Sequence, residues 1–163
     1  MPNWAEGSLK IRGTREDIIK FLKGALQPLL PPGSEIAKFM GKEVENPTAE
    51  ITENESYFEM KNKNGFHIKG THRAFIEQNI DWWFQDKHSE ILVIDNFKQA
   101  WGVDAGQLAE LSKVFNVDIK IHAFERGMEF NQEIEIHKGD IIKDDEIQFK
   151  DYDWDCVFPN LGG

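Results

Sequence analysis

Residues 91–125 constrain the fold of this 163-residue chain more than any other stretch. Residues 91–94 are apolar at four successive positions, which is typical of a strand buried on both faces inside a sheet. Residues 104–115 carry apolar side chains at helical spacing, and residues 117–122 alternate between apolar and polar as in a half-buried strand. The stretch therefore predicts a central strand, an amphipathic helix and a second strand in succession.

Two helices have recognisable N-terminal signals. Asp104 is followed three residues later by Gln107, and Thr14 by Asp17, which is the spacing at which a capping side chain meets the first turn of a helix. A short alternating strand over residues 8–12 comes before Thr14. Each helix is therefore expected to follow closely on a strand.

The middle of the chain is less regular. Residues 27–54 are rich in proline and polar residues, and we interpret them as a loop or an irregular insertion. Residues 57–60 and 66–69 flank a polar turn that contains Asn64 and Gly65, a dipeptide typical of hairpins. The sequence thus predicts a hairpin here.

Two further elements are predicted from periodicity. Ile76, Ile80 and Trp83 recur at i, i+4 and i+7, which predicts another helix beginning near Thr71. Residues 128–149 alternate between apolar and polar on either side of a turn, as strands of a meander do. The C-terminal third is therefore expected to be a β-meander.

The order strand, helix, strand, strand, helix, strand is that of ferredoxin-like α+β domains, provided that the helix near Trp83 is an insertion. We therefore predict a ferredoxin-like split βαβ sandwich with an inserted helix and a C-terminal β-meander. No repeat or break in composition divides the chain. Residues 1–163 are accordingly expected to form one α+β domain.

Composition places the chain in a broad class. Hydrophobic residues make up 40% and charged residues 29% of it, which favours a globular domain over a disordered or fibrous one. Cys156 is the only cysteine, so no disulfide can form within the chain and a reducing compartment is the simplest setting. No apolar stretch reaches the length of a membrane span, and no signal peptide is recognisable. We expect a cytoplasmic protein without a membrane partner.

Charge is unevenly distributed along the sequence. The formal net charge of −10 opposes general adhesion to nucleic acid. A basic run nevertheless extends from Lys61 through Lys63 and Lys69 to Arg73, with aromatic residues around it. Basic and aromatic side chains together are typical of nucleic-acid surfaces, so these four residues are candidates for an interaction face. The competing interpretation is a solvated hairpin.

The C-terminal end is strongly acidic, with nine acids and three lysines in residues 133–155. Asp151, Asp153 and Asp155 have the first spacings of a calcium-binding loop, but Cys156 stands where that loop needs glycine. We therefore predict no metal and no cofactor, and interpret these aspartates as a solvated or interacting surface. Trp154 lies among them and is a candidate anchor for a partner, because aromatic residues dominate binding hot spots.

Other residues are predicted to be structural. Trp101 is expected in the core, where the strand after residue 91 leads into the 104–115 helix. Histidines are not arranged in a metal-binding pattern, and no phosphate-binding loop or nucleophile elbow is present. The sequence therefore does not indicate an enzyme.

Three short motifs carry a resemblance to a known family. They are Pro2-Asn3-Trp4, the Phe-Lys-Gln-Ala-Trp segment at 97–101 and the Phe-Glu-Arg-Gly-Met-Glu-Phe segment at 124–130. In these motifs the chain resembles phage and plasmid proteins with a YubB-type ferredoxin-like domain. It departs from that pattern at Ala5-Glu6, where the family has a Cys or polar residue followed by Asn. The resemblance implies a mobile-element origin in a host bacterial cell and a ferredoxin-like fold, without catalytic residues.

These observations lead to three hypotheses about function. The first is a noncatalytic phage or prophage accessory protein, a protein-interaction module whose partner is a host or phage protein. The second is an inhibitor of host defence, in which the acidic residues 133–155 imitate the phosphates of nucleic acid. The third is a nucleic-acid-binding module that uses the basic run of residues 61–73.

Overall fold

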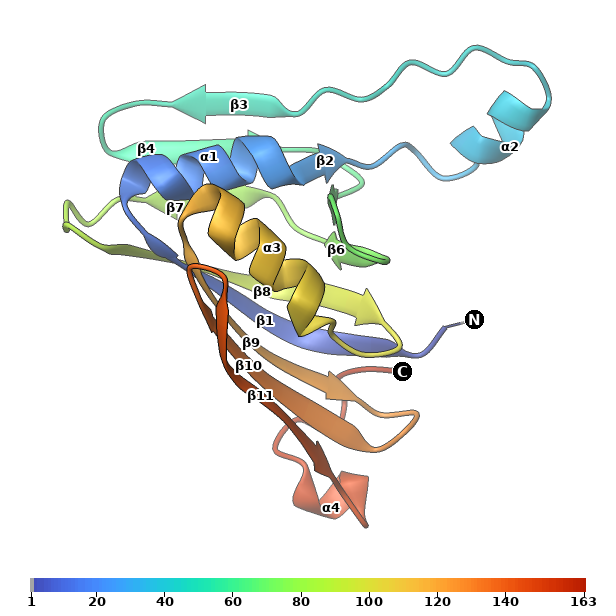
Figure 1. The fold of residues 1–163 in the computed structure, drawn as a ribbon. Coiled ribbons are helices and arrows are strands. Elements are labelled where there is room, and N and C mark those ends of the chain that lie inside the picture. The colour runs from blue at the N-terminus through green and yellow to red at the C-terminus, as the bar shows by residue number, and fades with distance from the viewer. Residues whose placement is uncertain (1) are drawn as a thin grey trace.

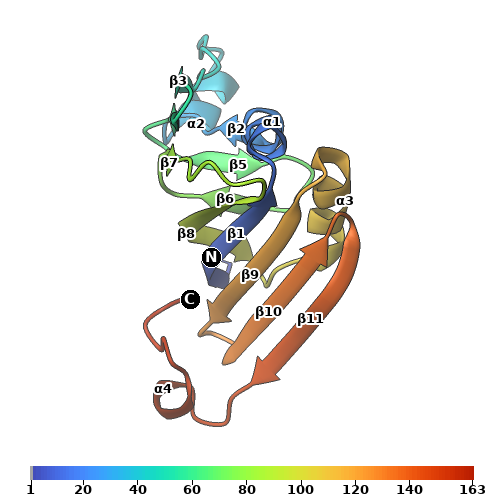
Figure 2. The same cartoon turned by 90° about the vertical axis from the view of Figure 1, so that its left-hand side faces the viewer.

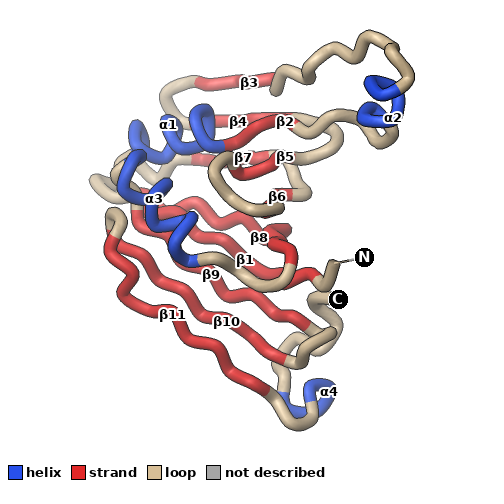
Figure 3. The backbone as a smooth tube through the Cα atoms, turned by 45° about the vertical axis from the view of Figure 1, so that its right-hand side comes forward, coloured by secondary structure: helices blue, strands red, loops and turns tan. Residues whose placement is uncertain are grey.

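The computed structural model describes residues 2–163, and these are dominated by β-structure (Figures 1 and 3). The described residues form eleven strands and four helices. The strands are β1 (Trp4–Gly13), β2 (Leu26–Pro28), β3 (Glu50–Glu53), β4 (Tyr57–Lys61), β5 (Phe66–Ile68), β6 (Ala74–Ile76), β7 (Ile80–Trp83), β8 (Glu90–Ala100), β9 (Asp118–Glu125), β10 (Phe130–His137) and β11 (Asp140–Gln148). The helices are α1 (Arg15–Ala25), α2 (Ser34–Phe39), α3 (Ala105–Phe115) and α4 (Tyr152–Asp155).

The strands are arranged in two sheets. The large sheet has eight strands in the order β11-β10-β9-β1-β8-β6-β5-β2, and the small sheet has three in the order β3-β4-β7. Neighbouring strands are antiparallel throughout both sheets. The long strands β1 and β8 to β11 form a twisted ribbon (Figure 2). The short strands β6, β5 and β2 of the large sheet follow beyond β8. The large sheet therefore ends on one side in a long strand, β11, and on the other in a short one, β2.

Helices α1 and α3 cover the same face of the large sheet (Figure 1). Each begins at its predicted cap, because the side chains of Thr14 and Asp104 both accept a hydrogen bond of 3.1 Å from the backbone N–H three residues later. Helix α3 ends at Asn116, whose φ of 55° is the left-handed conformation typical of a helix C-terminus. The two predicted helices are confirmed.

The core lies between this face and the helices. The aromatic rings of Phe21 in α1 and Phe115 in α3 meet edge to face, with their centroids 5.6 Å apart. The small sheet joins the same cluster of buried residues through Phe58 and Trp82. Both sheets and both long helices therefore share one apolar core.

The predicted ferredoxin-like split βαβ sandwich is wrong. That architecture has one sheet with two helices, whereas the described residues form a predominantly β structure with eleven strands in two sheets. The alpha+beta class fails with it, because α2 and α4 are only six and four residues long. The predicted meander is confirmed, since β9, β10 and β11 are consecutive antiparallel neighbours.

The inserted helix predicted near Thr71 is absent from this part of the chain, which forms β6 and β7 instead. Within each strand the burial alternates with a period of two, so that Ile76 and Ile80 point into the core from separate strands. Ile76 ends β6 and Ile80 begins β7, so the turn between the strands gives these two buried residues the i, i+4 spacing of a helix. Each short segment taken alone has the period of two that is typical of a strand, and only a window that spans both segments shows a helical period.

The predicted hairpin around Asn64 and Gly65 is also wrong. Strand β4 belongs to the small sheet and β5 to the large one, so the two do not pair. The turn itself exists, because the Gly65 N–H donates to the Asn62 carbonyl at 3.0 Å and Gly65 has a φ of 77°. The turn carries the chain from one sheet to the other instead of folding it back.

Three local predictions are corrected in part. Residues 27–54 are not wholly irregular, since they contain α2 and β3. Residues 91–94 lie in a central strand, but Ile91 and Val93 are exposed, so that only alternate residues are buried. Trp101 is not in the core, because 63% of its surface is exposed and it occupies a turn with a φ of 68°.

We expect Phe21→Ala to lower the free energy of unfolding by about 3–5 kcal/mol, because the substitution leaves a cavity in a fully buried site. Trp101→Gly should change it by no more than about 0.5 kcal/mol, since the ring is exposed and glycine adopts a positive φ without strain. Urea denaturation followed by circular dichroism measures both. A loss for Trp101→Gly as large as that for Phe21→Ala would contradict this assignment of the core.

Candidate functional site

The large sheet has a second face that α1 and α3 do not cover, which we call the open face. One group of its charged side chains comes from four neighbouring strands, since alternate residues of a strand point to the same side. They are Lys10 and Arg12 of β1, Asp118, Lys120 and His122 of β9, Glu133, Glu135 and His137 of β10, and Lys143 and Asp145 of β11. The strand register therefore determines which charges face one another.

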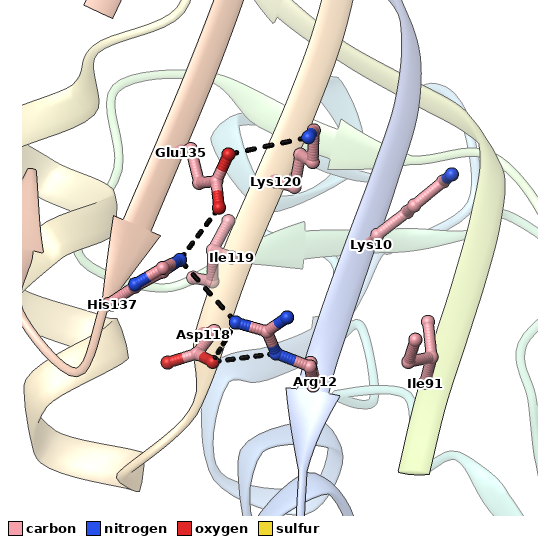
Figure 4. Close-up of a pocket in the computed structure, with 8 residues that line it drawn as sticks. All are labelled: Lys10, Arg12, Ile91, Asp118, Ile119, Lys120, Glu135 and His137. Atoms are coloured by element: carbon pink, nitrogen blue, oxygen red, sulfur yellow. Dashed lines mark hydrogen bonds and ion pairs between the residues drawn. The ribbon is translucent and has the colours of Figure 1, made fainter. Parts of the chain in front are cut away.

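One row of the open face runs from Arg12 to His137 (Figure 4). The Nη2 atom of Arg12 lies 2.6 Å from Asp118 Oδ2, and its Nε donates to the same oxygen at 2.8 Å. His137 Nε2 lies 2.7 Å from Glu135 Oε1 and 3.4 Å from Arg12 Nη2. A guanidinium can only donate and a carboxylate can only accept, so the single Nε2 atom of His137 cannot form hydrogen bonds with both Arg12 and Glu135. The shorter contact indicates that Nε2 donates its proton to Glu135.

Two carboxylates of the open face are held in their ionised form. The hydrogen bond from His137, and next that from Lys120 at 3.3 Å, lower the pKa of Glu135 below its usual value. A hydrogen bond from Lys143 lowers the pKa of Glu133, and the same contact raises the pKa of Lys143. These carboxylates therefore stay charged at neutral pH and neutralise the cations beside them.

The other end of the open face carries an aromatic cluster. Lys98 Nζ and Arg73 Cζ lie 4.6 Å and 5.2 Å from the centroid of the Trp4 ring, which are distances typical of cation–π interactions. The edge of Phe75 meets the same ring with centroids 5.9 Å apart, and His67 lies 5.5 Å from Phe75. Sequence reasoning missed this cluster, because its members come from five different strands or loops.

The four basic candidates are not brought together on one surface. Lys61 lies on β4 of the small sheet, where Glu59 pairs with it at 2.7 Å, and Lys63 follows in the turn. Lys69 follows β5, and its backbone N–H donates to the carbonyl of Ala25 at 2.8 Å. Arg73 alone reaches the open face, through its contact with Trp4. The basic run is therefore divided between two sheets.

Two of the three aspartate candidates serve local structure. Asp151 caps α4 by accepting from the Trp154 N–H at 3.2 Å, and Asp153 pairs with Arg126 at 3.3 Å. Asp155 is exposed, and no group of three metal-ligating side chains occurs in residues 2–163. Trp154 is 86% exposed, so its ring is accessible to solvent.

The C-terminal segment folds back onto the end of the large sheet (Figure 2). Tyr152 and Cys156 pack against Phe124 in a small buried cluster of their own. Burial raises the pKa of the Tyr152 hydroxyl above its ordinary value. The N–H of Gly162 donates to the Glu6 carboxylate at 3.1 Å, which ties the segment to β1. Cys156 is thus a packed structural thiol.

Strand β11 forms the outer border of the large sheet (Figures 1 and 2). Eight of its nine residues pair with β10 on one side, all except Ile142, and no other described strand lies on the opposite side. Asp140, Asp144, Asp145 and Glu146 are all exposed, as is the side chain of Ile142 at 58%. The sequence showed that this region is acidic, but its position at a sheet edge depends on pairings that the sequence did not reveal.

Comparison of the chain with family models, with curated proteins and with solved structures gave no match. The site is therefore interpreted from its geometry. Among the described residues, no helix is long and apolar enough to span a membrane.

We expect Glu135→Gln to lower the unfolding temperature at neutral pH, because it removes a carboxylate that Lys120 and His137 stabilise in its ionised form. A carboxyl pKa that is lower in the folded state stabilises the fold above the unfolded value and loses this effect as pH falls through the folded pKa. The difference from the wild type should therefore shrink below about pH 4.5.

Glu146→Gln is the control, because its carboxylate lies on the exposed outer strand. Differential scanning calorimetry from pH 3 to pH 7 should show a smaller and flatter difference for this variant. Equal pH profiles for the two variants would contradict the role of the Glu135 contacts.

Proposed function

We propose that this protein is a noncatalytic protein-interaction module that binds an extended basic segment of a partner protein along β11. The observation that carries the proposal is the combination of a nine-residue unpaired sheet edge with four exposed carboxylates. The resemblance of residues 2–4, 97–101 and 124–130 to phage and plasmid proteins supports a phage or prophage origin, with a host or phage protein as the partner.

The backbone of β11 offers a template for another strand. In an antiparallel pair, alternate residues direct their N–H and C=O groups away from the partner strand. These groups of β11 face outward from β10, where a peptide can add a further strand. Main-chain hydrogen bonds supply affinity in this binding mode, and alternate side chains supply specificity.

The negative charges of β11 favour a partner segment with a positive charge. Asp144 and Glu146 lie on one face of the strand and Asp145 lies on the other, because successive side chains alternate. The single cation of β11, Lys143, is paired with Glu133 and also lies 3.7 Å from Asp145 Oδ2, whereas Asp144 and Glu146 make no ion pair among the described residues. Basic residues at successive positions of an added strand therefore meet a carboxylate on either face. Each pair of opposite charges across two strands contributes about 0.2–1 kcal/mol.

The same charges discourage pairing between two copies of β11. An antiparallel pair centred near Asp144 places carboxylates of one copy beside those of the other, and like charges directly opposite destabilise a sheet. A register shift between Glu135 and Ile136 also leaves Ile142 as an extra residue, which bends the strand. Both features are typical of edges that are protected against aggregation, and neither opposes a basic strand.

Strand addition fits the acidic residues better than imitation of nucleic acid. The β11 carboxylates point to both faces of the sheet, whereas imitation of a phosphate backbone requires a row on one surface. The division of Lys61 and Arg73 between two sheets likewise favours a protein partner over nucleic acid bound by the basic run.

We expect a fluorescent nine-residue peptide with lysine at its three central positions and valine elsewhere to bind, with a salt-sensitive affinity measured by fluorescence anisotropy. The variant Asp144→Asn, Asp145→Asn, Glu146→Gln should bind about tenfold more weakly, since up to about 1 kcal/mol is lost at each position. The matched control Glu16→Gln, Glu35→Gln, Glu110→Gln removes the same charge from exposed helix positions and should bind as the wild type does.

A second peptide separates strand addition from simple charge attraction. Methylation of alternate backbone nitrogens leaves the side chains and charge unchanged but removes N–H donors that pair with a sheet edge. It should weaken binding at least tenfold. Equal affinity for the methylated and unmethylated peptides, or for the two triple variants, would rule out binding along β11.

A further inference from the structure

The register of the large sheet places two lysines directly opposite each other on the open face. Lys10 of β1 pairs with Lys120 of β9, so their Cβ atoms are neighbours across the two strands. Like charges in this position destabilise a sheet. A feature with such a cost calls for an anion between the two side chains.

The carboxylates around this pair do not neutralise it fully. Lys120 shares Glu135 with His137, and Asp118 is occupied by Arg12. Lys10 takes part in none of the interactions drawn in Figure 4. Three basic side chains therefore face two carboxylates, which leaves one positive charge in excess when His137 is neutral.

These side chains border a depression on the open face (Figure 4). It has a volume of about 110 Å³, whereas about 10–15 Å³ on the same measure is enough for one water molecule. Ile91 lines one side of it, beside Arg12 in the strand register. The space is thus large enough for a small oxyanion and lies between positive groups.

Arg12 retains hydrogen-bonding capacity toward this space. Its Nε and Nη2 atoms contact Asp118, whereas Nη1 is on the side of the guanidinium that faces away from the dashed contacts in Figure 4. A guanidinium held in place by a carboxylate loses little further freedom when it binds an anion. Charge-assisted hydrogen bonds from arginine and lysine are the ordinary means of holding phosphate.

We infer that the depression bordered by Lys10, Arg12 and Lys120 is a binding site for a phosphate group. A phosphate placed between the lysines offsets their repulsion and accepts hydrogen bonds from all three side chains. The site lies on the open face and not along the outer edge of β11, so it is independent of the proposed peptide binding.

The first test is a titration with inorganic phosphate at pH 7, followed by differential scanning fluorimetry and compared with sodium chloride at equal ionic strength. Phosphate should raise the unfolding temperature of the wild type saturably beyond the effect of the chloride, since a ligand that binds only the folded state stabilises it. Lys10→Gln should unfold at a higher temperature than the wild type without phosphate, and should lose most of the phosphate-dependent increase.

Lys20→Gln is the matched control, because this exposed lysine lies on α1, which packs on the other face of the sheet. It should respond to phosphate as the wild type does. A phosphate effect no larger than that of chloride, or an equal effect in Lys10→Gln and the wild type, would overturn the inference.

A second arm identifies the source of the phosphate. A ten-nucleotide oligothymidylate without terminal phosphates offers only phosphodiesters, and its binding is measured by fluorescence anisotropy. Binding that Lys10→Gln weakens at least fivefold assigns the site to a nucleic-acid backbone. A response to inorganic phosphate without oligonucleotide binding assigns it to a free phosphate or a phosphate monoester.

Discussion

The pairing of β1 with β8 on one side and β9 on the other is the interaction on which the rest of the structure depends. Its alternation directs Leu9 and Ile11 into the core and leaves Lys10 and Arg12 on the open face. A shift of one residue in either ladder would exchange these two sets, which would bury charge and expose the apolar residues. The burial of one face by α1 and α3 therefore selects the register that also forms the open face.

A glycine makes this arrangement possible at the point where β1 changes its pairing. The register with β8 shifts between Gly7 and Leu9, and a Cβ at position 7 would overlap the backbone of His122 and Ala123 in β9. The close approach keeps β9 paired along β1 while the other side of the strand accommodates the irregularity. The opposition of Lys10 and Lys120 follows from this ladder, so it results from tertiary pairing and not from any local motif.

Sequence patterns predicted the features that depend on neighbouring segments of the chain and missed those that depend on pairing between distant strands. The caps of α1 and α3 depend on contacts three residues apart, and the meander of β9 to β11 depends on pairing between consecutive strands. Both were therefore predictable. The helix near Thr71 was wrong because two short strands imitate a helical period across a turn. The cluster around Trp4 and the position of β11 at an edge arise from pairings between distant segments, which a single sequence does not reveal.

The sorting of charge between the two regions explains how an acidic protein can offer both an anionic and a cationic surface. On the open face, Glu133 pairs with Lys143, and Glu135 pairs with Lys120 and His137. The negative charge of both carboxylates is therefore neutralised within the sheet. At the outer strand the acids outnumber the cations, since β11 has four acids and one lysine, and that lysine is shared between Glu133 and Asp145. The excess positive charge remains near Lys10, because Glu135 is already shared by Lys120 and His137 and Asp118 is paired with Arg12. Net charge therefore says little about either surface, since each depends on which residues the antiparallel register places side by side.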